Sequence, residues 1–163
     1  MLMVPIPRIG AAIRPATVDD IPFIDQLQKM QRDRVGFMCT SWIEARIEAR
    51  QVLVADAAGY IIASDRYFKR DDCGIIYQIN VAPGAQRHLI GAALVKAQFE
   101  RSAYGCRLYC CWCAQDIEAN RFWESLGFIP LAYRAGSEKK NKGGRVHIFW
   151  QRRVRADDHQ TPY

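Results

Sequence analysis

The sequence predicts an α/β fold in which a mixed central sheet of about seven strands is flanked by four helices. The chain has 163 residues, of which 50% are hydrophobic and 25% are charged, as in one ordinary globular domain. Strand patterns and helical patterns alternate along it, and the strands outnumber the helices, so hairpins must be mixed with crossover helices. We therefore expect a single domain over residues 1–163, with its core at about residues 11–155.

The N-terminal half is predicted to hold four strands and two helices. Thr17, followed by Asp20 three positions later, marks the start of the first helix. Glu/Arg pairs indicate the exposed side of the second helix. Ala57, Ala58 and Gly59 form a hairpin turn between two apolar strands. The expected elements are a strand at 11–17, a helix with Ile21, Ile24, Leu27 and Met30 on its inner side, a helix at 41–50, two strands within 51–68 and a strand at 74–83.

The C-terminal half is predicted to hold two helices and three strands. A helix follows the Pro83-Gly84 turn, and another repeats apolar residues at helical spacing until Gly127 ends it. A polar loop at 137–144 separates the last two strands. The expected elements are a helix at 86–105, a strand at 107–113, a helix at 114–127 with Ala119, Phe122, Trp123 and Leu126 on one stripe, and strands at 128–136 and 145–154.

Six cysteines and no recognisable export signal predict free thiols in a reducing compartment, which makes the cytoplasm the expected location. In the strand at 107–113, Cys111 and Cys113 face one way and Cys110 faces the other, so the three thiols cannot converge on one metal ion. We therefore expect core cysteines and no metal. No apolar run reaches the 18 residues that a membrane span needs, so no membrane association is expected.

The net charge of +6 is concentrated near the C-terminus. Residues 134–155 contain eight basic residues and one acidic residue, Glu138, a local net charge of +7. Such a segment can attract phosphate, nucleic acid such as tRNA, or an acidic partner, and a solvated charged loop is the alternative. The basic residues are Arg134, Lys139, Lys140, Lys142, Arg145, Arg152, Arg153 and Arg155.

The most informative stretch joins the fourth strand to the next helix. Val81-Ala82-Pro83 ends the strand, and the residues from Gln86 to Gly91 open the helix. A helix start offers unpaired backbone N–H groups and the positive end of a dipole, so a phosphate or pyrophosphate can dock there. Arg87 and His88 add side-chain donors. A capped helix after a Pro-Gly turn is the structural alternative.

A second stretch adds to this motif. Asp116, Ala119, Phe122, Trp123, Gly127 and Phe128 follow the fifth strand. Together with the strand ending in V-x-P, the Q-x-x-x-x-G helix start and the order of elements, they resemble the GNAT superfamily of N-acetyltransferases. The resemblance runs along nearly the whole chain, from IRPAT to VHIFW.

The resemblance implies a site for acetyl-coenzyme A as co-substrate. The backbone at Ile79 and Val81 would pair with the pantetheine arm, and the fourth and fifth strands would splay apart to admit the thioester. An amine acceptor, either a small molecule or a peptide, would approach from the loops at 32–40 and 137–144, and a homodimer is compatible with this. The pyrophosphate would be cradled by Gln86, Arg87, His88, Leu89, Ile90, Gly91 and Ala92.

Three residues depart from the family pattern. Leu89 stands where the family has its first glycine, and a right-handed helical φ would suit a leucine there. Asp116 replaces an asparagine; it either contacts the coenzyme or caps the helix that begins there. Trp123 replaces the tyrosine that often protonates the departing thiolate, and an indole cannot supply that proton. Trp123 either lines the thioester slot or packs in the core, and Tyr109 and Cys113 have the same two interpretations.

The fourth strand offers no base for the acceptor amine, because Gln78 cannot act as one, and no catalytic residue is identified. Deprotonating a lysine at pH 7 costs about 4.6 kcal/mol, whereas an α-amino group costs only about 1.4 kcal/mol. The sequence therefore predicts direct acetyl transfer to an amine of low pKa. Two alternatives remain: a coenzyme-binding module that has lost catalysis, and an acetyltransferase for an RNA-linked amine such as aminoacyl-tRNA.

Overall fold

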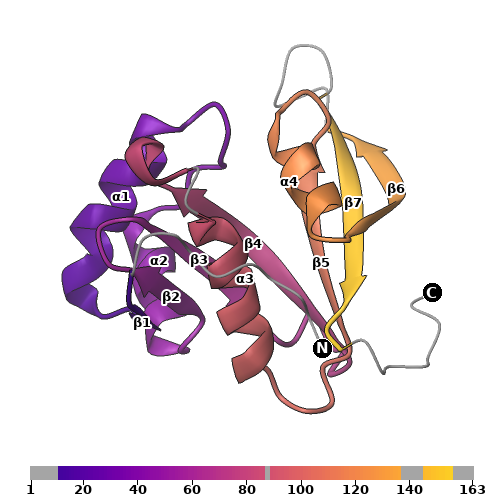
Figure 1. Ribbon diagram of the computed structural model, residues 1–163, viewed down its shortest axis with the longest axis horizontal. Coiled ribbons are helices and arrows are strands. Elements are labelled where there is room, and N and C mark those ends of the chain that lie inside the picture. The colour runs from indigo at the N-terminus through magenta and orange to yellow at the C-terminus, as the bar shows by residue number, and fades with distance from the viewer. Residues whose placement is uncertain (1–10, 87–88, 137–144, 156–163) are drawn as a thin grey trace. The chain divides into compact units, whose positions relative to one another are not determined.

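The computed structural model describes residues 11–86, 89–136 and 145–155 (Figure 1). The order of the elements agrees with the sequence prediction. They are β1 (Ile13–Pro15), the 3₁₀ turn η1 (Val18–Asp20), α1 (Ile21–Met30), α2 (Thr40–Glu48), β2 (Val52–Ala55), β3 (Gly59–Ser64), β4 (Cys73–Val81), the 3₁₀ turn η2 (Pro83–Ala85), α3 (Ile90–Arg101), β5 (Leu108–Ala114), α4 (Ala119–Ser125), β6 (Ile129–Ala135) and β7 (Val146–Arg153).

The strands form a seven-stranded sheet in the order β1-β2-β3-β4-β5-β7-β6. β4 and β5 are parallel, whereas β1–β2, β2–β3, β5–β7 and β6–β7 are antiparallel. The described residues contain four α-helices. The predicted fold class, a mixed sheet of seven strands with four helices, is therefore confirmed.

The described residues group into two compact units. The N-terminal unit contains residues 11–64 and 76–103, and the C-terminal unit contains residues 65–75 and 104–155. β4 begins in the C-terminal unit, where Cys73–Ile75 pair with Leu108–Cys110 of β5, and its remaining residues belong to the N-terminal unit.

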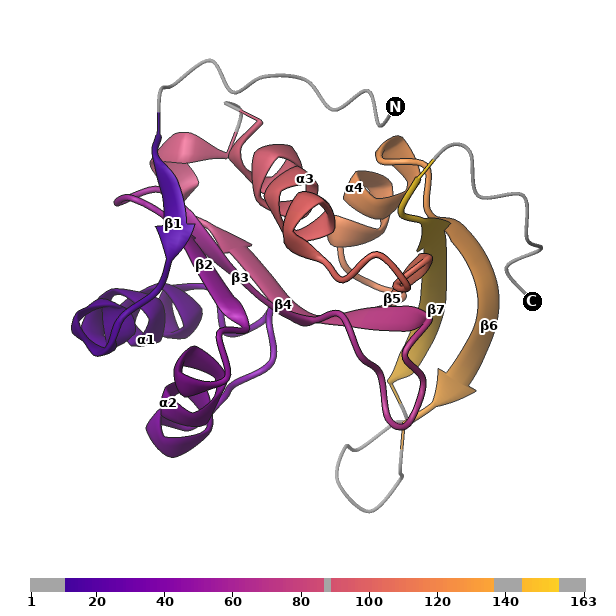
Figure 2. The ribbon, with the colours of Figure 1, turned by 90° about the horizontal axis from the view of Figure 1, so that it is seen from below.

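In the N-terminal unit, helices cover both faces of the sheet. Figure 2 shows α3 on one side of β2, β3 and β4, and α1 and α2 on the other. The face toward α1 and α2 is apolar: Ile24 and Leu27 of α1 and Ile43 of α2 pack with Tyr60 and Ile62 of β3. The α1 stripe was predicted correctly at Ile24 and Leu27, but Met30, the last residue of α1, is 62% exposed.

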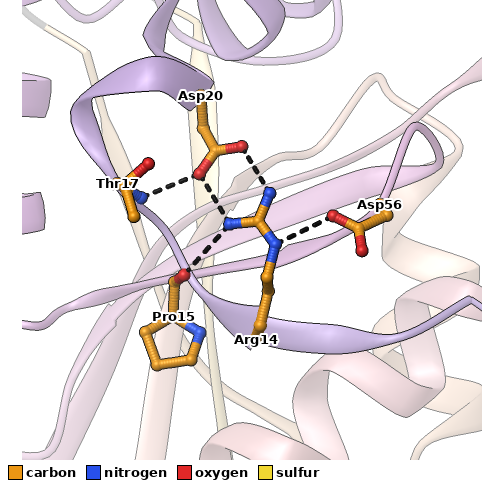
Figure 3. Close-up of polar contacts among 5 residues, drawn as sticks. All are labelled: Arg14, Pro15, Thr17, Asp20 and Asp56. Atoms are coloured by element: carbon orange, nitrogen blue, oxygen red, sulfur yellow. Dashed lines mark hydrogen bonds and ion pairs between the residues drawn. The ribbon is translucent and has the colours of Figure 1, made fainter.

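A network of hydrogen bonds and ion pairs centred on Arg14 stabilises the start of the N-terminal unit (Figure 3). Arg14 of β1 donates to both carboxylate oxygens of Asp20, at 2.9 and 2.8 Å, and to Asp56 at 3.0 Å. Asp20 also accepts from the backbone N–H of Thr17 at 2.7 Å, and the two residues form the predicted capping box. One guanidinium thus ties β1 to η1 and to the β2–β3 turn.

In the C-terminal unit, α4 packs against one face of the sheet formed by β5, β7 and β6. Register pairs Cys113 with Ile148 and Trp112 with Phe149, so neighbouring pairs point to opposite faces. On the α4 face, the indole N–H of Trp150 donates to Asn120 of α4 at 3.0 Å. Trp112 and Phe149 therefore belong to the face away from α4.

The cysteines are free thiols, and five of the six are buried. Cys110 and Cys111 are adjacent in β5 and point to opposite faces, as the strand pattern predicted. The Cys73 and Cys110 sulfurs lie 4.0 Å apart, and that hydrogen bond together with burial raises the pKa of Cys110. None of the helices in the described ranges is long and apolar enough to cross a membrane.

Candidate functional site

The turn between β4 and α3 is the segment to which the sequence assigns an anion site. β4 ends at Val81, η2 covers Pro83–Ala85, and α3 begins at Ile90 after the N-cap residue Leu89. The N–H of Ala93 bonds to the Leu89 carbonyl at 3.0 Å. The backbone N–H groups that precede Ala93 have no acceptor inside the helix, and such groups at a helix start can bind a phosphate.

Leu89 adopts a left-handed backbone conformation, with φ 62° and ψ 20°. The expectation of a right-handed helical φ at this residue is therefore wrong. A side chain in this region costs roughly 1–2 kcal/mol, so the position favours glycine. The turn thus keeps a backbone conformation suited to the glycine that the resemblance expects, although it carries a half-buried leucine.

Glutamine side chains hold the end of β4. The Nε2 of Gln31 donates to the Val81 carbonyl at 2.7 Å, and the Nε2 of Gln86 approaches the same oxygen at 3.3 Å. The carbonyl of Val81 is therefore already hydrogen-bonded within the protein. Ile79, the other residue expected to pair with the pantetheine arm, lies half-buried in the same strand. Gln86 contributes here through its side chain, which the sequence did not predict.

The other residues expected around the pyrophosphate differ in what they offer. Ile90, Gly91 and Ala92 are buried in the first turn of α3, so this turn offers backbone N–H groups rather than polar side chains. Arg87 and His88 lie outside the described residues.

A buried polar pair lies where β3 and β4 meet the α1–α2 loop. The Tyr60 hydroxyl donates to Oε1 of Gln78 at 2.5 Å, and Nε2 of Gln78 donates to the Gly36 carbonyl. Both side chains are at least nine-tenths buried, and burial raises the pKa of Tyr60, so its hydroxyl stays protonated. Gln78 links two strands to the loop and, as expected, supplies no base.

A second glutamine fixes the far end of that loop. Nε2 of Gln28 donates to the Met38 carbonyl at 2.8 Å, and Oε1 of Gln28 accepts from the Met38 N–H at 3.0 Å. Sequence reasoning missed this role. Gln28 follows the buried Ile24 by four residues, so a polar residue on the inner stripe of α1 was the available signal.

Trp123 is packed in the C-terminal unit with one of the other slot candidates. It is 4% exposed, and its ring meets those of Phe122 and Phe128 at centroid distances of 5.0 Å. Its indole hydrogen-bonds the Cys113 sulfur, and burial raises the pKa of Cys113 to about 11. Tyr109, the third candidate, is fully buried in β5. Trp123 and Cys113 are thus brought together on the α4 face.

Asp116 does not cap α4, which corrects that expectation. The helix begins at Ala119 without a side-chain cap, and Asp116 pairs with Arg145 at 2.9 Å, which lowers the pKa of the Asp116 carboxyl. Asn120 organises the turn instead. Its Nδ2 donates to the carbonyls of Ala114 and Ile117 at 2.8 and 2.9 Å. Asn120, the second residue of α4, thus holds the turn that precedes the helix without capping it.

Several arginines of the basic segment serve the fold. Arg145 pairs with Asp116, Arg152 donates to the Leu126 carbonyl, and Arg155 donates to two backbone carbonyls at 3.2 Å each. The three lysines of the segment and Glu138 lie outside the described residues. Of these three arginines, Arg145 has its charge offset by a carboxylate, whereas Arg152 and Arg155 keep their positive charge while they bond to neutral carbonyls.

Solved structures share this fold. Ard1 from Thermoplasma volcanium has a TM-score of 0.75 at 17% identity, with 90% of this chain and 99% of that chain covered. The yncA protein from Salmonella typhimurium, solved with acetyl-CoA, has a TM-score of 0.73 at 22% identity, covering 95% and 99%. The ribosomal-protein-S18-alanine N-acetyltransferase from Escherichia coli has a TM-score of 0.67 at 17% identity, covering 92% and 98%.

Sequence comparison identifies the family. No curated protein sequence matches the chain. A family model described as the acetyltransferase (GNAT) domain matches residues 48–130, just over half of the chain. The match includes β4, the turn at Leu89 and α3, the segment that the sequence and the helix geometry single out. The chain belongs to the GNAT acetyltransferase family.

Proposed function

We propose that this protein transfers an acetyl group from acetyl-CoA directly to an amine. The observation that carries the proposal is the β4–α3 turn, which lies inside the segment matched by the GNAT model and leads into a helix start whose first backbone N–H groups have no acceptor within the helix. The acetyltransferase family supplies the reaction class, and the turn supplies a place for the anionic part of the coenzyme.

The residues of this turn fit a coenzyme pyrophosphate. The left-handed Leu89 ends the turn, and the buried Ile90, Gly91 and Ala92 direct backbone donors rather than bulky polar side chains to the helix start. These three residues would hold the pyrophosphate, together with Gln86, Arg87 and His88. The bound coenzyme supplies an activated thioester, and the chain then has to orient the amine beside it.

The acceptor amine must arrive neutral. Gln78 has no basic atom, and the buried Tyr60 hydroxyl that donates to it has a raised pKa. β4 carries no carboxylate. We therefore propose an acceptor of low amine pKa, such as an α-amino group, with its proton passing to water.

Binding of acetyl-CoA is tested by thermal denaturation with and without the coenzyme. At a hundred times its dissociation constant, acetyl-CoA should add about 2.7 kcal/mol to the free energy of unfolding. Acetylpantetheine, which lacks the pyrophosphate, is the matched control and should stabilise the protein much less at the same concentration. Equal stabilisation by the two ligands would show that the β4–α3 turn does not bind the pyrophosphate.

Transfer is tested separately, because Trp123 in place of the family tyrosine favours a second function, coenzyme binding without catalysis. Free coenzyme A release should be measured with a panel of α-amino compounds and alkylamines across pH 6–10. We expect the rate to rise with pH and to level off near the pKa of the acceptor, about 8 for an α-amino group. Coenzyme binding without thiol release from any amine would instead establish the binding module.

A further inference from the structure

Arg134 occupies an unusual position on the face of the C-terminal unit away from α4. It lies in the exposed edge strand β6, opposite His147 of β7. Its guanidinium carbon is 4.0 Å from the ring centroid of Trp112 in β5. Trp112 in turn meets Phe149 of β7, with ring centroids 4.9 Å apart. Three neighbouring strands thus build one small surface, in which the guanidinium of Arg134 lies on the Trp112 ring and that ring packs against Phe149.

The stack leaves the hydrogen-bonding edge of Arg134 unused. A guanidinium that lies on a ring still directs its N–H groups outward in its own plane. Within the described ranges, these N–H groups have no hydrogen-bond acceptor and no carboxylate partner. Arg14, Arg66, Arg70 and Arg145, in contrast, each hold a carboxylate within 3.0 Å.

The same surface contains a second unsatisfied donor. The Nε1 of Trp112 is buried and has no acceptor among the described residues. Buried polar atoms of this kind are few in native proteins, because each costs about 1–3 kcal/mol. The indole N–H of Trp112 therefore lacks an acceptor among the described residues. This observation is independent of the free N–H groups of Arg134.

We infer that Arg134, held on the Trp112 ring, binds the carboxylate of the acceptor, so that the preferred acceptor is a small amine that carries a carboxylate. The paired N–H groups of a planar guanidinium match the two oxygens of a carboxylate. Stacking on Trp112 already restricts the conformation of the Arg134 side chain, so less freedom is lost when a ligand binds. The Trp112–Phe149 pair offers apolar contact beside the charge. One free arginine suits one carboxylate, whereas a nucleic acid requires several cations.

This inference rests on the proposed acetyl transfer and agrees with it in the kind of amine. An amino acid presents an α-amino group, the class of amine that a site without a base can use.

The test compares standard L-amino acids with their carboxamides, which keep the amine but lose the negative charge. The wild-type protein should acetylate the acids with a lower KM than the amides. Arg134→Gln should raise KM for the acids about 10- to 100-fold, because a charge-assisted hydrogen-bonded pair is lost, and should leave KM for the amides unchanged. Arg134→Lys should recover only part of the loss.

Controls separate this inference from the proposed function. Arg121→Gln removes an exposed positive charge from α4 in the same unit and should leave both KM values unchanged. Acetyl-CoA affinity should be equal in all variants. Equal KM values for acids and amides, in the wild type and in Arg134→Gln, would overturn the carboxylate site and leave acetyl transfer intact.

If no amine is acetylated, the proposed function fails and the carboxylate site is decided by binding. Amino acids should then change the tryptophan fluorescence of the wild-type protein at concentrations that leave Arg134→Gln unaffected, and the carboxamides should have no effect. The same response to acids and amides would overturn the site in this case as well.

Discussion

Arg46 and Arg134 both lie on aromatic rings, and their N–H groups have different surroundings. Arg46 of α2 lies 4.3 Å from the Trp42 ring centroid and 4.6 Å from that of Tyr77, and it donates to Oε1 of Gln51 at 2.7 Å. Arg134 of β6 covers one ring and has no hydrogen-bond acceptor among the described residues. The first arginine joins a helix to β4 and to the residue before β2, whereas the second joins only its own sheet.

The comparison indicates that a structural residue differs from a binding residue in whether its polar atoms have hydrogen-bond partners, more than in whether it stacks on a ring. A side chain whose polar atoms all have partners contributes to folding, and replacing it costs stability. A side chain fixed by packing with polar atoms left over costs little stability when replaced, and its loss should appear in binding. Gln78 belongs to the first kind and Arg134 to the second.

Gln78→Met should give the largest loss of stability, because Gln78 is the most completely engaged of these side chains. The variant removes the acceptor of the buried Tyr60 hydroxyl and the donor to the Gly36 carbonyl. We expect the free energy of unfolding to fall by about 2–3 kcal/mol, as measured by urea denaturation.

The double variant Tyr60→Phe with Gln78→Met provides the control for this loss. It also removes the Tyr60 hydroxyl, which has no acceptor once Gln78 is replaced. The free energy of unfolding of the double variant should therefore exceed, by at least about 0.5 kcal/mol, the value expected from adding the losses of Tyr60→Phe and Gln78→Met. Strictly additive losses would mean that Tyr60 and Gln78 do not stabilise each other.

Arg46→Ala and Arg134→Ala test the two stacks directly. Arg46→Ala loses two ring contacts and a charge-assisted hydrogen bond, and we expect it to lower the free energy of unfolding by about 1–2 kcal/mol. Arg134→Ala loses one exposed ring contact and should cost less than about 1 kcal/mol. Similar losses in the two variants, measured under identical denaturation conditions, would remove the distinction between the stacks.

Sequence reasoning predicted the order of the elements because hydrophobic periodicity is a local property. The capping box of Thr17 and Asp20 is also local, and it was predicted. Met30 was misplaced because it is the last residue of α1, where the helical stripe no longer faces the core. Periodicity indicates which side of a helix faces inward, but the packing of the ends is decided by neighbouring elements.

The candidate site was less predictable than the fold. The β4–α3 turn was found from its spacing, but the left-handed φ of Leu89 is set by how the turn joins strand and helix. Arg134 meets Trp112 only because β7 lies between β6 and β5, an order that pairs strands far apart in sequence. Asp116 likewise pairs with Arg145, 29 residues away, instead of capping the nearer helix.

The arginine network of β1 supplies the smallest effect, and it depends on pH. Hydrogen bonds from Arg14 lower the pKa of Asp20 below its usual 3.8. A carboxyl whose pKa is lower in the folded state stabilises the fold above its unfolded pKa, and this stabilisation is lost as the pH falls through the folded value. Asp20→Asn should therefore destabilise the protein equally at pH 5 and pH 7, and progressively less below pH 4.

Asp19→Asn, which changes an exposed carboxylate in the same turn, is the matched control and should show no such trend. A stability difference between Asp20→Asn and the wild type that is as large at pH 3 as at pH 7 would mean that the Asp20 charge does not stabilise this network.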